Sequence, residues 1–268
     1  MLVTIRRLLR TERTRLIILS LALAVWFLLI LLVVRSSAAD VAAQSQAFGS
    51  NLGKGFGLGS LITPTAVLTQ LLGVSFNHPI VLAIIGAATV ALGARACQGE
   101  LLHGTLDVTL SRSLARWRYL LGYAVVMALA TVLLMSVSWG AMVGLERLLH
   151  VPGELEAGRA FEACANGAVV FFACGTIALL VSVLLGRRGS AMFVSVGVLV
   201  VMYATTFVER VWSNAILQFI APVSVFHWFD PGAVLSGTGP TAADYAVPSL
   251  IAIACTALAA WRFERRDL

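Results

Sequence analysis

The stretch QGELLHGTLDVTLSRSLARWR, from Gln98 to Arg118, decides the fold because it is a polar interruption between two long apolar segments. The chain of 268 residues is 59% hydrophobic and 12% charged, yet this stretch holds five charged residues: Glu100, Asp107, Arg112, Arg116 and Arg118. Leu102, Leu106 and Leu110 recur every four residues, so a helix here would carry an apolar ridge beside a polar one. A short amphipathic helix covers such a ridge with the bilayer surface or with another protein.

Apolar segments on both sides of this stretch predict an all-α integral membrane protein with six transmembrane helices. The mean hydropathy of +0.93 leaves too little polar surface to cover a water-soluble globule. Connections between the apolar segments are too short to form a second domain, so residues 1–268 are expected to form one transmembrane domain. The expected spans are residues 16–34, 79–96, 119–145, 163–186, 189–208 and 245–261.

The segment before the first span, Met1 to Arg15, contains five arginines with isoleucine and leucine between them. This composition predicts an interfacial helix on the inner leaflet, with its arginines on anionic lipid headgroups. A targeting peptide has a similar composition, but this segment runs directly into the first span without a processing linker. Membrane lipid is therefore an expected partner.

Two further segments contain apolar stretches but are not predicted to be transmembrane helices. Between Arg35 and His78 the chain is rich in glycine and serine, and only its second half, Leu58 to Phe76, is apolar enough to lie on the outer leaflet. Pro64 marks the expected start of a helix there. Val211 to Phe229 contains several polar residues and a proline, and is predicted to be a re-entrant or interfacial segment on the outer face before the sixth span.

The charge distribution gives the expected orientation. With six spans and a cytoplasmic N-terminus, 14 of the 19 basic residues fall in cytoplasmic segments, and eight of the 13 acidic residues fall outside. This asymmetry satisfies the positive-inside rule, so both termini are expected to be cytoplasmic. A seventh span at 211–229 would instead move the C-terminal arginines to the outer side.

The amino-acid sequence of the polar stretch also resembles that of a known protein family. ARACQGE from Ala94, GTLD from Gly104, LSR from Leu110 and LLGY from Leu120 resemble the first cytoplasmic loop of type 2 ABC transporter permeases. In that family the loop reads roughly A-R-x-I-A-G-E-E-x-x-G-T-L-E-L-L-L-S-R-P-V-S-R before L-L-G-K opens the next span. This chain departs from the pattern at Leu101, Ser113 and Tyr123. A shorter likeness, SVFHWFDP at 224–231, is similar to the last outer loop of the family.

The resemblance implies a permease subunit of an ATP-driven exporter in the bacterial cytoplasmic membrane. Its implied partners are a separate ABC ATP-binding subunit, which holds the ATP and magnesium, and a second permease subunit, identical or different. The stretch would form a cytoplasmic coupling helix between spans two and three that sits in a groove of the ATPase. The residues expected to couple are Glu100, Leu102, Gly104, Thr105, Leu106, Asp107, Leu110, Arg112 and Arg116.

Other chemistries lack their motifs in this sequence. No phosphate-binding loop, metalloprotease motif or nucleophile elbow occurs, so no catalytic residue is expected and the chain cannot hydrolyse ATP alone. The four cysteines have no C-x-x-C spacing and the four histidines are dispersed, so no metal site is expected. One lysine stands against eighteen arginines, as is usual in proteins from a GC-rich genome, so the basic balance says little about nucleic acid, which is not an expected partner. No expected span buries a carboxylate or an arginine, as a proton-coupled pump would require.

Two other classes of protein fit the same span count. A scaffold or assembly factor would share the charge asymmetry, and only the polar stretch argues against it. A membrane-embedded enzyme would need polar side chains that face one another, for which Asn166, Thr176 and Ser182 are the only modest candidates. Groups of this kind more often serve helix packing.

Overall fold

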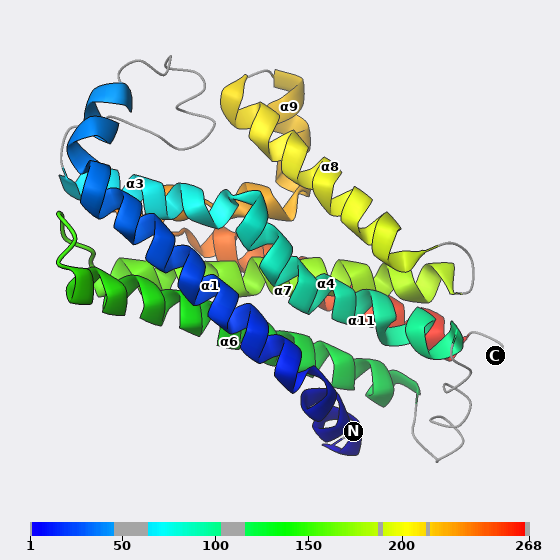
Figure 1. Cartoon of the computed structure of the whole chain (residues 1–268). Helices are drawn as coiled ribbons and strands as arrows, with labels where there is room; N and C mark the ends of the chain where they lie inside the picture. The colour runs from blue at the N-terminus through cyan, green and yellow to red at the C-terminus, as the bar shows by residue number, and fades with distance from the viewer. Residues whose placement is uncertain (1, 46–63, 103–115, 187–189, 213–214, 266–268) are drawn as a thin grey trace.

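The computed structural model describes residues 2–45, 64–102, 116–186, 190–212 and 215–265, and every regular element within these ranges is a helix (Figure 1). Six of the described helices are long and apolar enough to cross a membrane, which confirms the predicted number of spans. These six are α1 (Leu2–Ser45), α4 (Pro79–Leu102), α6 (Arg116–Leu149), α7 (Ala157–Leu185), α8 (Ala191–Val211) and α11 (Ala242–Glu264). The shorter helices are α3 (Pro64–Asn77), α9 (Ala215–Ile220) and α10 (Pro231–Ser236), with 3-10 turns η1 (Ala221–Val223) and η2 (Val225–Trp228).

The first helix is continuous from Leu2 to Ser45, without a break between the arginine-rich segment and the span. Four residues spaced four apart in its N-terminal part are buried in the protein: Thr4, Leu8, Glu12 and Leu16. Thr4 lies against Gly122 of α6, so this stripe packs on the bundle. The arginines at 6, 7 and 10 remain exposed on the other face, and their contact with the inner leaflet stays a prediction.

Helices α4 and α6 both extend further than the expected spans. The polar stretch therefore begins as the last turn of α4, up to Leu102, and ends as the first turn of α6, from Arg116. The predicted coupling helix between them falls on residues 103–115, which lie outside the described residues. In Figure 1 the facing ends of α4 and α6 lie at the same end of the bundle as the two chain termini.

The segments predicted to lie on the outer face form short helical pieces. Helix α3 begins at Pro64, as the sequence predicts, because proline at the first helical position gives up a donor that has no helical partner there. Between α8 and α11 the longest described piece is six residues, and the six candidate spans do not include this region. How deep the segment at 211–229 enters the bilayer stays a prediction.

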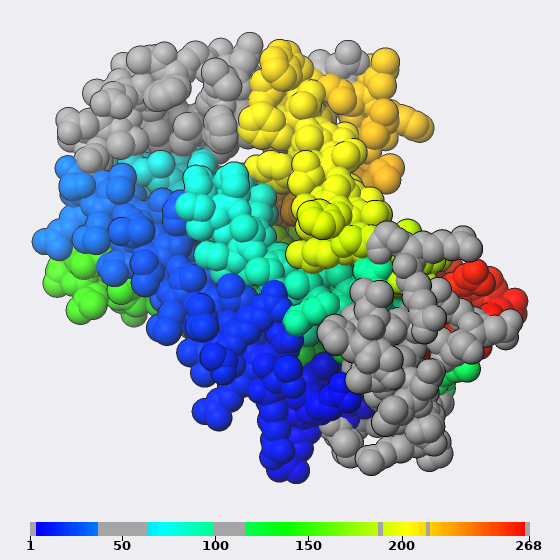
Figure 2. All heavy atoms as spheres, turned by 45° about the vertical axis from the view of Figure 1, so that its right-hand side comes forward, coloured from blue at the N-terminus to red at the C-terminus, as the bar shows by residue number. Residues whose placement is uncertain are grey.

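The tightest helix pair is α4 with α7. A Cβ atom added at Gly93 would overlap the Gly175 carbonyl oxygen and come within 2.8 Å of the Leu179 nitrogen, so only glycine allows this approach. Helix α7 buries 15 of its 29 residues, and it lies at the centre of the bundle. Helix α8 buries only four of 21, and its yellow atoms stand out from the face of the molecule in Figure 2.

Candidate functional site

The structure describes only part of the predicted coupling element. Arg116 begins α6, and its guanidinium donates a 3.5 Å hydrogen bond to the Glu264 carbonyl near the end of α11. Glu100 and Leu102 belong to the last turn of α4, and their side chains are not described. The remaining predicted residues lie outside the described residues: Gly104, Thr105, Leu106, Asp107, Leu110 and Arg112.

The two described ends of the polar stretch are joined by Tyr119. Its buried hydroxyl donates a 2.8 Å hydrogen bond to the Ala96 carbonyl of α4, and its ring stacks on Phe263 of α11 with centroids 6.3 Å apart. The ring of Tyr123 packs against the Tyr119 ring, with their centroids 5.2 Å apart. The chain thus leaves α4 and returns to α6 at one packed base, which a separate hydrophobic cluster of α1, α4, α6, α7 and α11 supports.

Ser182 of α7 binds the end of α4 at the same level. Its hydroxyl accepts hydrogen bonds from the backbone N–H groups of Cys97 and Gln98, at 3.2 and 3.0 Å, and donates one of 2.7 Å to the Ala94 carbonyl. All of these groups are buried. Ser182 therefore serves helix packing rather than the polar cluster that an embedded enzyme would need.

The side chain of Gln98 extends this contact to α8. Its Nε2 donates a 3.0 Å hydrogen bond to the Gly186 carbonyl at the end of α7, and its Oε1 accepts one of 2.6 Å from the Ala191 N–H at the start of α8. The side chain is 7% exposed. Sequence reasoning placed Gln98 at the beginning of the polar stretch without assigning it a partner.

Glu12 is a buried charge that sequence reasoning missed. It is 5% exposed, and its carboxylate accepts from Arg95 of α4 at 2.9 Å and from Arg15 of its own helix at 3.4 Å. Arg15 also donates to the Ala87 carbonyl of α4. The expectation that no span buries a carboxylate is therefore corrected, because α1 continues as one helix through Glu12. The four-residue spacing of Thr4, Leu8 and Leu16 was the available signal.

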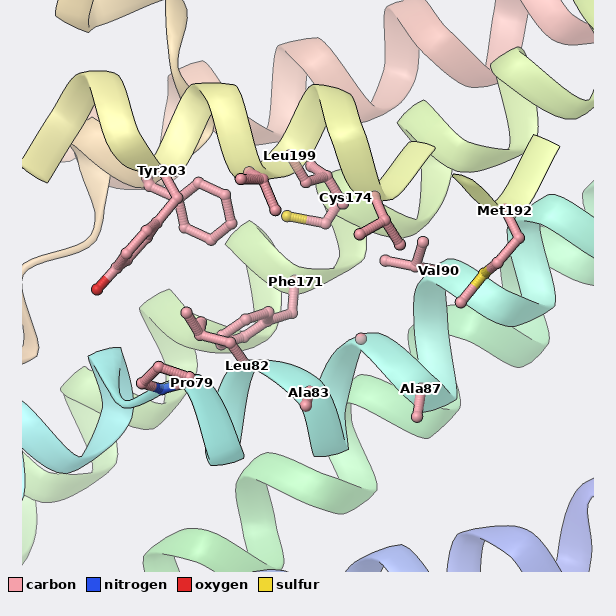
Figure 3. A pocket seen from close by; sticks show the side chains of 14 residues that line it. Pro79, Leu82, Ala83, Ala87, Val90, Phe171, Cys174, Met192, Leu199 and Tyr203 are labelled. Atoms are coloured by element: carbon pink, nitrogen blue, oxygen red, sulfur yellow. The ribbon is translucent and has the colours of Figure 1, made fainter. Parts of the chain in front are cut away.

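An apolar groove of about 490 Å³ lies between α4, α7 and α8 (Figure 3). Leu82, Val90, Phe171, Leu199 and Tyr203 are among the side chains around it. None of the residues that line it is charged, so it suits apolar groups and offers no acid, base or metal ligand set.

The end of the groove near Pro79 and Tyr203 is more polar. A second cavity of about 240 Å³ shares Pro79, Tyr203 and Phe226 with the first. The Tyr203 hydroxyl donates a 2.9 Å hydrogen bond to the Asn77 carbonyl there and ties α8 to the end of α3. Arg210, which also lines this cavity, donates to the Phe229 carbonyl at 2.9 Å and so joins α8 to the residue that follows η2.

Asn166 of α7 has a structural partner in α11. Its Nδ2 donates hydrogen bonds to the Asp244 carbonyl at 2.8 Å and to the Trp228 carbonyl at 3.2 Å. Pro248 lies four residues after Asp244 and has no N–H, so the Asp244 carbonyl lacks its helical donor, and Asn166 replaces it. Within the described ranges, no group of three or more His, Cys, Asp or Glu residues is placed to hold a metal ion.

Comparison with known families decides the class. The family model described as "ABC-2 family transporter protein" matches residues 9–268. The chain belongs to this family. The match confirms the resemblance found in the polar stretch and extends it to nearly the whole length of this ABC-2 permease.

No curated protein and no solved structure matches this ABC-2 permease. It is a multi-pass membrane protein with six candidate spans, and it is the membrane component of an ABC transporter. Permeases of this family generally pair with ATP-binding subunits.

Proposed function

We propose that this chain is the permease subunit of an ATP-driven exporter and is energised by a separate ATP-binding subunit. The observation that carries the proposal is the polar stretch from Gln98 to Arg118, whose wording matches the coupling loop of the family. Its two described ends meet at the packed base around Tyr119. A rigid base of this kind suits a loop that receives force from a partner.

The partner subunit would hold ATP and magnesium, because this sequence has no phosphate-binding loop and needs no cofactor of its own. Two permease subunits above two ATP-binding subunits would form the complete transporter. The positive-inside asymmetry supports placing the base and both termini in the cytoplasm. The apolar groove between α4, α7 and α8 is the described cavity best suited to an apolar part of the transported molecule.

The coupling residues would divide into two sets. The leucines at 102, 106 and 110 would fill the groove of the ATPase, while the charged residues Glu100, Asp107 and Arg112 would pair at its rim. Gly104 would allow close backbone approach, and Thr105 would cap the following turn. Arg116 would keep this element next to α11 through the Glu264 carbonyl.

The deciding experiment introduces a charge into the leucine ridge. Leu106→Asp would place an unpaired carboxylate in a desolvated contact and is expected to weaken association with the ATPase by about a hundredfold or more. Val108→Asp is the matched control, because two residues along a helix turn the side chain by about 200° to the other face. The partner to purify with is a soluble protein with a phosphate-binding loop encoded by a neighbouring reading frame.

Each outcome of this experiment assigns the stretch a role. The proposal expects normal abundance of both variants in the membrane and loss of the ATPase from Leu106→Asp alone. Loss of the permease itself would show that the stretch is structural, as in a scaffold. Full ATPase binding by Leu106→Asp would contradict the proposal.

A further inference from the structure

We infer that Gln98 is a positioning residue that couples the polar stretch to α8, and through α8 to the apolar groove. The inference rests on the proposed function, since it assigns a path for the force that the stretch would receive. Gln98 is the first residue of the polar stretch, two positions before Glu100, and its carboxamide contacts both ends of the connection between α7 and α8.

Helices α4 and α7 can transmit a displacement because they move as a pair. Gly93 brings their backbones into contact, and Ser182 binds three backbone groups of α4 with its single hydroxyl. Packed interiors resist continuous deformation, so a shift at the end of α4 carries α7 with it. The width of the groove then depends on the position of α8 relative to the pair of helices α4 and α7.

Helix α8 depends on Gln98 at its cytoplasmic end. The first N–H groups of a helix have no partner within it, and Ala191, the first residue of α8, is fully buried. The Gln98 oxygen satisfies this N–H at 2.6 Å. Much of α8 is exposed, with Phe193 near its start 80% and Val201 in its middle 65% exposed, so the attachment at Ala191 is an important contact at this end of the helix.

The same attachment sets the width of the groove at this end. Met192 follows Ala191 directly and Val196 lies about one turn further on, and both line the groove together with Ala87 and Val90 of α4. A displacement of the α4 end therefore moves these facing walls together while the Gln98 bond is intact. Without the bond, α4 and α7 can move while the start of α8 stays behind.

The first test measures the bond itself in the full-length permease, in nanodiscs of phosphatidylethanolamine and phosphatidylglycerol. Gln98→Met keeps the length of the side chain but removes both polar groups, so hydrogen exchange at the Ala191 amide is expected to rise about tenfold. Ser138→Ala on α6 is the control, because its buried hydroxyl donates only to the Leu134 carbonyl of its own helix and binds neither Gln98 nor Ala191. Unchanged exchange in Gln98→Met would overturn the inference.

The second test measures coupling in the complex with the ATP-binding subunit. Spin labels at Phe193 on α8 and Leu129 on α6, both exposed, report the distance between these helices with and without bound nucleotide. We expect a nucleotide-dependent change in the otherwise unaltered chain and in Ser138→Ala, and none in Gln98→Met, while the ATPase still co-purifies with all three.

Ala191→Pro provides an independent variant for the second test. Proline is tolerated at the first position of a helix, where it removes the N–H that Gln98 binds and adds two ring carbons. The preceding Ser190 has φ −103° and ψ 111°, which are compatible with a following proline. It should lose the nucleotide-dependent change as Gln98→Met does. Persistence of the change in both variants would overturn the inference, whereas failure of every variant to bind the ATPase would overturn the proposed function and leave the exchange result standing.

Discussion

The hydroxyl of Tyr119 donates a 2.8 Å hydrogen bond to the carbonyl of Ala96, and this bond closes a loop of 23 residues at its base. It joins the start of α6 to the last turns of α4, at the point where the polar stretch leaves and re-enters the bundle. The bond therefore holds the two helices together at the base of the polar stretch.

Replacing Tyr119 tests this closure. Tyr119→Phe keeps the ring against Phe263 and removes only the hydroxyl, so the free energy of unfolding should fall by about 1–2 kcal/mol. Unfolding by sodium dodecyl sulfate in mixed micelles would measure it. Tyr245→Phe is the control, because its longer hydrogen bond of 3.2 Å lies at an exposed site. An equal loss in the two variants would contradict the special role of Tyr119.

The contact between α4 and α7 predicts a sharp difference between two glycines of one helix. Gly93→Ala would force a Cβ atom into the backbone of α7, and we expect it to lower the free energy of unfolding by about 1–3 kcal/mol. Gly86→Ala meets its nearest atom, on Val90, at 3.9 Å and should be neutral or slightly stabilising through helix propensity. Thermal unfolding of both variants in the same detergent decides the comparison.

Asn166 and Pro248 should behave as a coupled pair. Asn166→Leu removes the donor to the Asp244 carbonyl and should cost about 1–3 kcal/mol of unfolding free energy. In a Pro248→Ala background the alanine N–H can serve that carbonyl, so the same change should cost about 1 kcal/mol less. A double-mutant cycle measures the difference, and strictly additive effects would show that Asn166 does not replace the missing helical donor.

Two buried serines predict opposite responses to the same substitution. Within the described part of the chain, the Ser195 hydroxyl on α8 has no hydrogen-bond partner, so Ser195→Ala should leave stability unchanged or raise it by about 1 kcal/mol. Ser182→Ala should lower stability by about 1–2 kcal/mol because it leaves buried partners unsatisfied. A loss in Ser195→Ala as large as in Ser182→Ala would mean that its hydroxyl is satisfied in the membrane.

The proposed orientation predicts which sites an impermeant thiol reagent can reach on whole cells. Three of the four native cysteines are buried, so a Cys255→Ala background is sufficient. A cysteine at the exposed Ser236 should react, and one at Asp267 should not. Labelling of Asp267→Cys together with protection of Ser236→Cys would invert the orientation.

The number of spans could be predicted because twenty apolar residues have few alternatives to a membrane-crossing helix. The helix start at Pro64 was equally predictable, since proline constrains the backbone locally. The packing of the N-terminal part of α1 on the bundle could not be predicted. An amphipathic segment has the same residue pattern whether it packs on a bilayer or on protein, and only the position of the partner helix distinguishes the two cases.

Roles in the candidate site could be predicted only for residues whose sequence matches the motif of a known family. Glu100 to Arg112 could be assigned a role from their wording, but Gln98 could not, because its partners lie 88 and 93 residues away. Long-range hydrogen bonds of one polar side chain leave no periodic signal in a sequence. For Glu12 a signal existed, but the four-residue spacing includes a charge that a purely apolar criterion rejects.

The two partners of Glu12 are synthesised at different times. Arg95 is added 83 residues after Glu12, and a ribosome adds about 5–20 residues per second, so the buried pair cannot form for about 4–17 seconds. Arg15 lies only three residues ahead on the same helix and is available at once. In the nascent chain Arg15 is thus the first partner of the Glu12 carboxylate, and Arg95 becomes the second when α4 has been synthesised and packs against α1.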